Sequence, residues 1–218
     1  MSKVFIIGAA GKIGRRLVRR LADRGHQSLA LHRKPEQRGE LQALGGTPIA
    51  GSLLDLDAQG LAQFMSGSDA VVFTAGAGGV GMELTNAIDG RGLELSVTAV
   101  KLAGIKRFVL VSVFPDALRG GRVSEGFENY IAVKKQADVR LVETDLDWII
   151  VRPGTLVDTP GHGKVCADVA ISYGNVSRDD VAATIVELVE QPAVNRIIIE
   201  LTQGDMPIGD AIRRLVRR

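Results

Sequence analysis

Short apolar runs alternate with amphipathic stretches along the whole chain, and this alternation constrains the fold more than any other feature. The run from Val4 to Ile7 is continuously apolar, which is typical of a strand buried on both faces. After it, Ile13, Leu17 and Leu21 recur at helical spacing, while arginines occupy the remaining positions. Such a switch between a buried strand and an amphipathic helix predicts one strand–helix unit, and the pattern repeats to the end of the chain.

The repeated pattern gives an ordered set of expected elements. Strands are expected at 4–7, 29–31, 48–50, 70–73, 108–111, 148–151 and 197–199. Helices are expected from 13 up to Gly25, from Pro35 to Leu44, and at 56–65, 82–103, 129–143, 179–190 and from 207 onward. Because parallel neighbours need crossover connections, this order predicts a doubly wound α/β fold with a mostly parallel sheet and helices on both faces.

Composition restricts the class of protein further. The 218 residues are 45% apolar and 24% charged, as in an ordinary globular domain. The net charge of +2 is too small to indicate a polyanion partner. Aromatic residues make up only 4%, too few for a base-stacking platform, so no nucleic-acid partner is expected. A single cysteine, no stretch long enough to span a membrane and no metal-ligand spacing lead us to expect a cytoplasmic protein without a metal.

No linker or repeat divides the chain, so a single domain over residues 1–218 is expected. Two irregular stretches, 114–126 and 154–174, follow strands at the carboxyl end of the predicted sheet. Open α/β sheets bind ligands at that edge, and long loops in compact domains are usually functional or disordered. We therefore expect the substrate region to be small and to lie within about 154–218.

A glycine-rich loop connects the first strand directly to the first helix. Gly8 permits a tight turn, Gly11 allows a pyrophosphate to approach the backbone, and Gly14 allows helix and strand to pack closely. Backbone N–H groups and the positive helix end would then face the anion. A tight turn without a ligand is the alternative. The predicted diphosphate-binding residues are Gly8, Ala10, Gly11, Lys12, Ile13 and Gly14.

The end of the second strand discriminates between the two nicotinamide dinucleotides. NAD-binding folds place a carboxylate there for the ribose 2′-hydroxyl, but residues 31–34 contain none before Glu36. A guanidinium at Arg33 can bind a 2′-phosphate in bidentate fashion. We therefore predict NADP(H) over NAD(H), with Arg33 as the main determinant and Lys34 or Lys12 assisting. A solvated basic strand end is the alternative.

Two further segments are candidates for the nucleoside. Leu54 and Asp55 follow the third strand, where the adenine ring would lie, and Asp55 could either accept from the adenine amino group or cap the next helix. Ala75 and Gly76 follow the fourth strand and offer small side chains where a ribose needs close approach. Beyond Gly76, a flexible loop is an equal alternative.

Four segments together resemble a known family. They are GAAGKIG at 8–14, RFVLVS at 107–112, the Tyr130–Lys134 spacing, and VRPG at 151–154. They are similar to atypical short-chain dehydrogenase/reductases, in style the NAD(P)-binding, NmrA-like group often labelled epimerase/dehydratase. The resemblance covers essentially the whole chain and implies a Rossmann-type domain. It also implies that Pro153, Gly154, Thr155, Ser112 and Lys134 contact the cofactor.

The catalytic candidates are Ser112, Tyr130, Lys134 and Asp89. Tyr130 and Lys134 are four residues apart, so they share one helix face, and a nearby ammonium is expected to lower the phenol pKa. Ser112 could bond a substrate carbonyl or only cap a turn. The resemblance implies that Lys134 holds the nicotinamide ribose and that Tyr130 transfers the proton. It also puts Asp89 where the family uses asparagine, which brings the usual proton relay into question.

These residues favour an NADP(H)-dependent oxidoreductase that transfers hydride to a small carbonyl, quinone or flavin-like acceptor. One alternative is a non-catalytic, NmrA-like protein that senses NADP(H). A further alternative is an epimerase/dehydratase. A small-molecule substrate is expected and no membrane partner, while a homodimer stays open.

Overall fold

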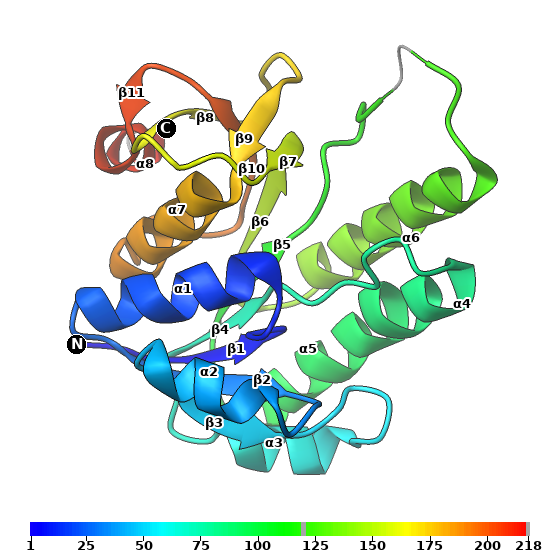
Figure 1. Ribbon diagram of the computed structural model, residues 1–218, viewed down its shortest axis with the longest axis vertical. Helices are drawn as coiled ribbons and strands as arrows, with labels where there is room; N and C mark the ends of the chain where they lie inside the picture. Colours follow the sequence, from blue (N-terminus) through cyan, green and yellow to red (C-terminus); the bar gives the residue numbers. More distant parts are fainter. Residues whose placement is uncertain (119–120, 217–218) are drawn as a thin grey trace.

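The computed structural model describes residues 1–118 and 121–216 (Figure 1). Its strands are β1 (Lys3–Ile7), β2 (Gln27–His32), β3 (Thr47–Ala50), β4 (Ala70–Phe73), β5 (Arg107–Val111), β6 (Asp147–Pro153), β7 (Thr155–Val157), β8 (Lys164–Asp168), β9 (Asn175–Ser177), β10 (Ile197–Gln203) and β11 (Met206–Pro207). Its helices are α1 (Lys12–Asp23), α2 (Gln37–Ala43), α3 (Ala58–Met65), α4 (Met82–Thr85), the π-helical η1 (Asn86–Arg91), α5 (Gly92–Leu102), α6 (Glu125–Val142), α7 (Arg178–Glu190) and α8 (Ile208–Leu215).

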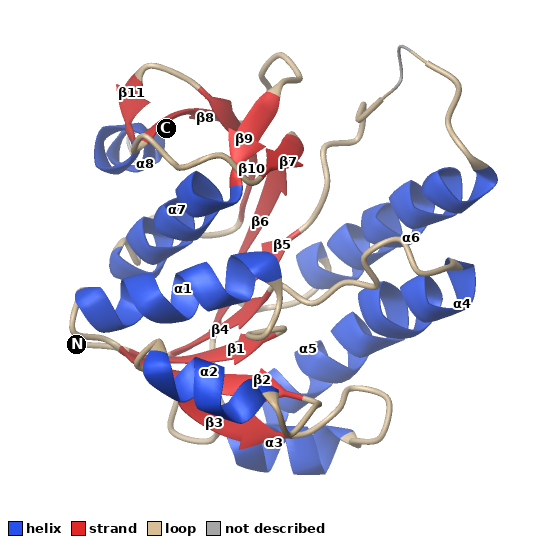
Figure 2. Cartoon of the chain, in the orientation of Figure 1, coloured by secondary structure: helices blue, strands red, loops and turns tan. Residues whose placement is uncertain are grey.

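Nine strands form one sheet in the order β11-β8-β10-β6-β5-β4-β1-β2-β3 (Figure 2). In this spatial order, every neighbouring pair between β10 at one end and β3 at the other is parallel. Strand β8 runs antiparallel to both β10 and β11. The predicted doubly wound, mostly parallel fold is confirmed. Chain order reverses between β1 and β4, and ligands bind at such a switch point in open α/β sheets.

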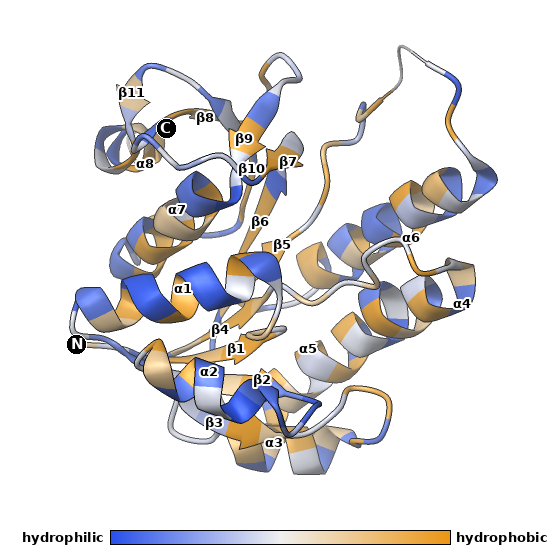
Figure 3. Cartoon of the chain, viewed as in Figure 1, coloured by the Kyte–Doolittle hydropathy of each residue, from blue (hydrophilic) through white to orange (hydrophobic). Residues whose placement is uncertain are grey.

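Alternate residues of the strands build two hydrophobic layers. Val4 and Ile6 face the layer covered by α1, α2, α7 and α8, whereas Phe5 and Ile7 face the layer covered by α3, α5 and α6. Figure 3 shows the central strands mostly in hydrophobic colours and the outer side of α1 in hydrophilic ones. A strand buried on both faces has no polar side, which is why Val4 to Ile7 carries no alternation.

Several expected boundaries were wrong. The single helix expected over 82–103 is interrupted by the π-helical η1. Helix α6 begins at Glu125 rather than 129, because the Ser124 side chain caps it by accepting from the Phe127 N–H at 3.2 Å. Residues 154–174 are not one irregular loop, since β7 and β8 lie within them. In the described part of the chain, no helix has both the length and the apolar composition needed to cross a membrane.

Candidate active site

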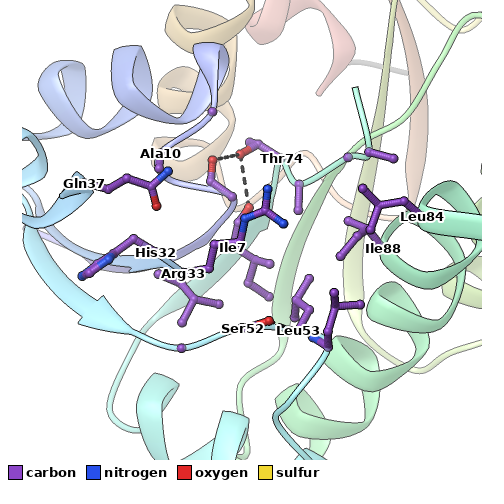
Figure 4. Close-up of a pocket in the computed structure, with 18 of the residues that line it drawn as sticks. Ile7, Ala10, His32, Arg33, Gln37, Ser52, Leu53, Thr74, Leu84 and Ile88 are labelled. Atoms are coloured by element: carbon purple, nitrogen blue, oxygen red, sulfur yellow. Dashed lines mark hydrogen bonds between the residues drawn. The ribbon is translucent and has the colours of Figure 1, made fainter. Parts of the chain in front are cut away.

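A cavity of about 350 Å³ opens at the carboxyl edge of β1, β2, β3 and β4 (Figure 4). Its floor consists of strand ends and its far wall comes from α4 and η1. The lining residues are Ile7, Gly8, Ala10, Gly11, Leu31, His32, Arg33, Gln37, Gly51, Ser52, Leu53, Leu54, Thr74, Ala75, Gly76, Ala77, Val80, Leu84 and Ile88. The cavity therefore coincides with the topological switch point of the sheet.

The glycine loop at one end of the cavity allows no side chain at two positions. Gly8 has φ +89°, and a Cβ there would lie 2.5 Å from the backbone nitrogen of Ala75. A Cβ at Gly14 would collide with the Gly8 carbonyl oxygen and the Ala9 backbone. Thr74 holds the turn from the neighbouring strand, because its hydroxyl donates to the carbonyls of Ile7 and Gly8, each at 3.2 Å. The backbone of the glycine loop is thus packed closely against Thr74 and Ala75 at this end of the cavity.

Helix α1 presents free backbone donors to this loop. Gly11 is its N-cap residue and supplies no capping side chain, and the first turn carries no acidic residue. The exposed N–H groups and the positive end of the helix dipole therefore favour an anion. Among the predicted neighbours, Lys12 instead donates to Asp158 at 2.6 Å, which holds the pKa of that carboxyl below its usual value. The Ile13 side chain is buried in the core, so only its backbone can face a ligand.

At the end of β2, Arg33 lines the cavity and Lys34 does not. The Arg33 side chain extends into the cavity in Figure 4, and it forms no ion pair with a carboxylate of the described residues. Lys34 is exposed, with its ammonium 4.0 Å from Glu36. None of the described lining residues is Asp or Glu.

Of the predicted nucleoside contacts, Leu54, Ala75 and Gly76 line the cavity, whereas Asp55 is exposed and does not. The alternative role of Asp55 as a helix cap is wrong. The cap of α3 is Asp57, whose carboxylate accepts from the Gly60 N–H at 2.7 Å.

Beyond the cavity, a buried lysine connects three elements. The Lys134 ammonium donates to the Val111 carbonyl at 2.8 Å and lies 3.6 Å from Asp89 on η1. Asp89 and Lys134 are each only 2% exposed. The other Asp89 oxygen accepts from the Ala77 N–H at 3.0 Å, so Asp89 connects Lys134 to the cavity wall.

Tyr130 lies one turn before Lys134 on α6, as its spacing predicted, but its electrostatic environment is different from the expected one. Burial raises the pKa of its phenol above the ordinary value of 10.0, and the carboxylates of Asp89 and Asp138 raise it further. The expected lowering by Lys134 is wrong, because Asp89 already pairs with that ammonium and desolvation disfavours a phenolate. Tyr130 is therefore protonated at neutral pH.

Ser112, directly after β5, is buried beside a second ion pair. Arg152 donates from Nε to one Asp138 oxygen at 2.9 Å, and its Nη2 lies 2.8 Å from the same oxygen in the ion pair. Burial raises the pKa of the Asp138 carboxyl. The Ser112 hydroxyl, which faces this carboxyl, lowers the same pKa by a smaller amount. Neither Ser112 Oγ nor Asp138 Oδ1 has a hydrogen bond of good geometry, so both retain capacity for a partner.

The predicted contacts at 153–155 lie where β6 ends and β7 begins, and they are not part of the cavity lining. Gly154 is pressed against the Gly174 carbonyl, where a Cβ would collide. The Thr155 hydroxyl and the Tyr173 hydroxyl are 2.5 Å apart. This turn therefore joins the end of β6 to the 173–175 segment.

Comparison with known proteins agrees with this geometry. The model of a family described as NAD(P)H-binding matches residues 8–192. This chain belongs to the NAD(P)H-binding family. It is 37% identical over 215 residues to the "uncharacterized sugar epimerase YhfK" of Bacillus subtilis, with 98% of this chain and 100% of the relative covered.

Two solved structures extend the comparison. A Bacillus halodurans protein provisionally named an NAD-dependent epimerase/dehydratase has a TM-score of 0.90 and 32% identity, covering 99% of this chain and 100% of that one. The anaerobillin reductase ChuY of Escherichia coli O157:H7 has a TM-score of 0.78 and 25% identity, covering 94% and 98%. The predicted resemblance is confirmed, and the protein is a member of an NAD(P)-binding oxidoreductase and epimerase-like family.

The cavity of this NAD(P)H-binding protein fits a dinucleotide. The absence of side chains at Gly8 and Gly14 lets the loop pack tightly against Ala75 and against its own backbone, and the uncapped start of α1 supplies donors for a diphosphate. Arg33 would hold a negative group at the β2 end, and Leu54 with Ala75 would contact the nucleoside.

Several residues of the candidate site were not predicted from the sequence. Gln37, Ser52 and Leu53 line the cavity, as do Val80, Leu84 and Ile88 from the far wall. Asp138 and Arg152 form the ion pair behind Ser112. Only Asp138 had a readable signal, because it follows Lys134 by four residues and so lies on the face that carries Tyr130. Within the described ranges, no group of three His, Cys, Asp or Glu side chains could hold a metal ion.

Proposed function

We propose that this chain is an NADPH-dependent reductase that delivers hydride to a small carbonyl, quinone or flavin-like acceptor. The observation that carries the proposal is Arg33, a cation without a carboxylate partner among the described residues, in a cavity whose described lining has no acidic side chain. A 2′-phosphate would be attracted there, whereas the carboxylate that binds a 2′-hydroxyl in NAD-specific folds is missing.

The protonated state of Tyr130 supports reduction as the direction. Reduced nicotinamide supplies the hydride, and the acceptor oxygen then needs a proton. A phenol with a raised pKa holds that proton at neutral pH. Lys134, anchored to Val111 and Asp89, would position the ribose rather than acidify the phenol.

Titration calorimetry with NADPH and NADH tests the cofactor preference. A charge-assisted contact is worth about 1.5–3 kcal/mol, so NADPH should bind roughly tenfold to a hundredfold more tightly than NADH. Arg33→Ala should remove most of this difference and leave NADH affinity unchanged. Equal affinities in the unmodified protein would contradict the proposal.

Oxidation of NADPH against a panel of carbonyls, quinones and flavins tests the chemistry. Once an acceptor is turned over, Tyr130→Phe should lower kcat by roughly 10²–10⁴ while calorimetry shows unchanged NADPH binding. Turnover at the full rate in Tyr130→Phe would reject Tyr130 as the acid.

A second candidate function is a protein that binds NADP(H) without turnover. The Asp89–Lys134 pair favours it, because a carboxylate without N–H donors stands where the family's asparagine is expected and neutralises the lysine. Tight NADPH binding with no oxidation by any acceptor class would select this candidate. An epimerase/dehydratase, the activity in the name of the Bacillus halodurans structure, would instead convert substrate without net NADPH consumption.

A further inference from the structure

The turn between β2 and α2 fixes the orientation of an amide at the cavity rim. Gln37 is the first residue of α2 and lines the cavity. Its side-chain oxygen accepts from the backbone N–H of Lys34 at 3.1 Å. Because a backbone N–H can only donate, the amide cannot be flipped, and its NH2 group is left free. In Figure 4 this amide points from α2 toward Ala10, across the rim.

The Lys34 carbonyl in the same turn already has two hydrogen-bond partners. The Lys34 carbonyl receives the Gln37 N–H at 3.1 Å and faces His32 Nδ1 at 3.0 Å. Since a carbonyl cannot donate, His32 carries its proton on Nδ1, and both lone pairs of the carbonyl are occupied. On the neighbouring strand end, Ser52 Oγ already accepts from the Leu54 N–H at 3.2 Å.

Two side chains at this end offer donors to a ligand. They are the Arg33 guanidinium and the Gln37 NH2, with no carboxylate among the described lining residues. We propose that Gln37 is a specificity-determining residue that, together with Arg33, binds a phosphate monoester on the 2′-oxygen of the adenosine ribose. This inference rests on the proposed NADPH preference and extends it to a second residue.

The chemistry of the two ligands explains the selectivity. A 2′-phosphate dianion offers only acceptors and matches two sets of donors. A free 2′-hydroxyl carries a donor of its own, which would lack a strong acceptor here, and leaving a buried polar group unpaired is unfavourable. Arg33 adds charge, whereas Gln37 adds a directional donor held by the backbone of Lys34.

Gln37→Glu tests the inference, because the carboxylate keeps the size of the side chain and the bond to Lys34 N–H but replaces two donors by acceptors. Calorimetry with NADPH, NADH, adenosine 2′,5′-bisphosphate and 5′-AMP should show at least about tenfold weaker binding of the two 2′-phosphorylated probes. NADH and 5′-AMP should bind as before or more tightly. Gln37→Leu, which adds no charge, should weaken only the phosphorylated probes, by roughly threefold to tenfold.

Gln42→Glu is the matched control, because it makes the same charge change on the same helix at an exposed position outside the cavity lining. It should leave all four affinities within about twofold of the unmodified protein. If Gln37→Glu behaves like Gln42→Glu, or weakens NADH and NADPH equally, the inference is overturned while the proposed function stands. If the unmodified protein does not distinguish NADPH from NADH, the cofactor preference itself fails.

Discussion

At the scale of single residues, the chain holds a charge pair in its interior behind Ser112. Asp138 is 3% exposed, and the hydrogen bond from Arg152 Nε and the ion-pair contact from Arg152 Nη2 reach the same carboxylate oxygen. Burial raises the pKa of Asp138, which shows that desolvation of the carboxylate exceeds the compensation from Arg152, Ser112 and Lys134. Such a pair holds α6 to β6 only while both partners are present.

Removing either partner should therefore destabilise the protein strongly. Asp138→Ala and Arg152→Ala should each lower the free energy of unfolding by about 3–5 kcal/mol, because each leaves an uncompensated buried charge. The double variant should lose clearly less than the sum of the two, since no unpaired charge remains. Guanidinium unfolding of the four proteins measures this cycle. Additive losses would mean that the two side chains do not interact.

Residue-scale prediction from the sequence was good within one helix and poor across helices. The four-residue spacing of Tyr130 and Lys134 brought them to one face, as expected, because helix geometry is local. The expected sign of the Tyr130 pKa shift was wrong, because the burial of the phenol and the approach of Asp89 from η1 depend on packing between elements, which the spacing does not reveal.

At the scale of elements, the glycine loop and η1 shape the cavity from opposite ends. The loop brings the start of α1 against β1, and η1 brings Asp89 to the Ala77 N–H. Segments of π-helix occur often at functional sites. The loop was predictable because its glycines are visible in the sequence. The π-helical η1 was not predictable, because its apolar pattern is typical of an ordinary helix.

Gly14→Ala should impair both folding and binding. Its Cβ would meet the backbone of Gly8 and Ala9, which cannot move without opening the loop. We expect a loss of about 1–3 kcal/mol in the free energy of unfolding and at least tenfold weaker NADPH binding.

Gly39→Ala on α2 is the matched control for this substitution. A Cβ at Gly39 has nothing within 4 Å. This variant should gain about 0.5–1 kcal/mol in helix stability and bind NADPH normally. Normal NADPH binding by Gly14→Ala would contradict the dependence of the binding site on the tight packing of this loop.

At the scale of the whole molecule, the sheet brings the carboxyl ends of four strands to one cavity, so a bound dinucleotide would contact segments from 7 to 88. A ligand that binds only the folded state stabilises all of them together. The effect depends on the dissociation constant and the ligand concentration alone.

NADPH at a hundred times its dissociation constant should add about 2.7 kcal/mol to the free energy of unfolding, and raise the Tm by roughly 5–10 °C. NADH at the same concentration should give a much smaller rise, because its affinity is expected to be lower. A thermal unfolding series with both nucleotides checks this. No shift with either would contradict dinucleotide binding to the folded protein.

The sequence alone determined the doubly wound sheet, the position of the glycine loop and the Tyr130–Lys134 face. These features are readable because periodicity and glycine placement act over contiguous residues. The tertiary structure alone decided that Lys12 pairs with Asp158, that Asp89 neutralises Lys134, and that the Gln37 amide faces the cavity. Each of these depends on which backbone and side-chain groups lie within hydrogen-bonding distance after folding, and the free energy of such contacts is set by burial and geometry rather than by sequence spacing.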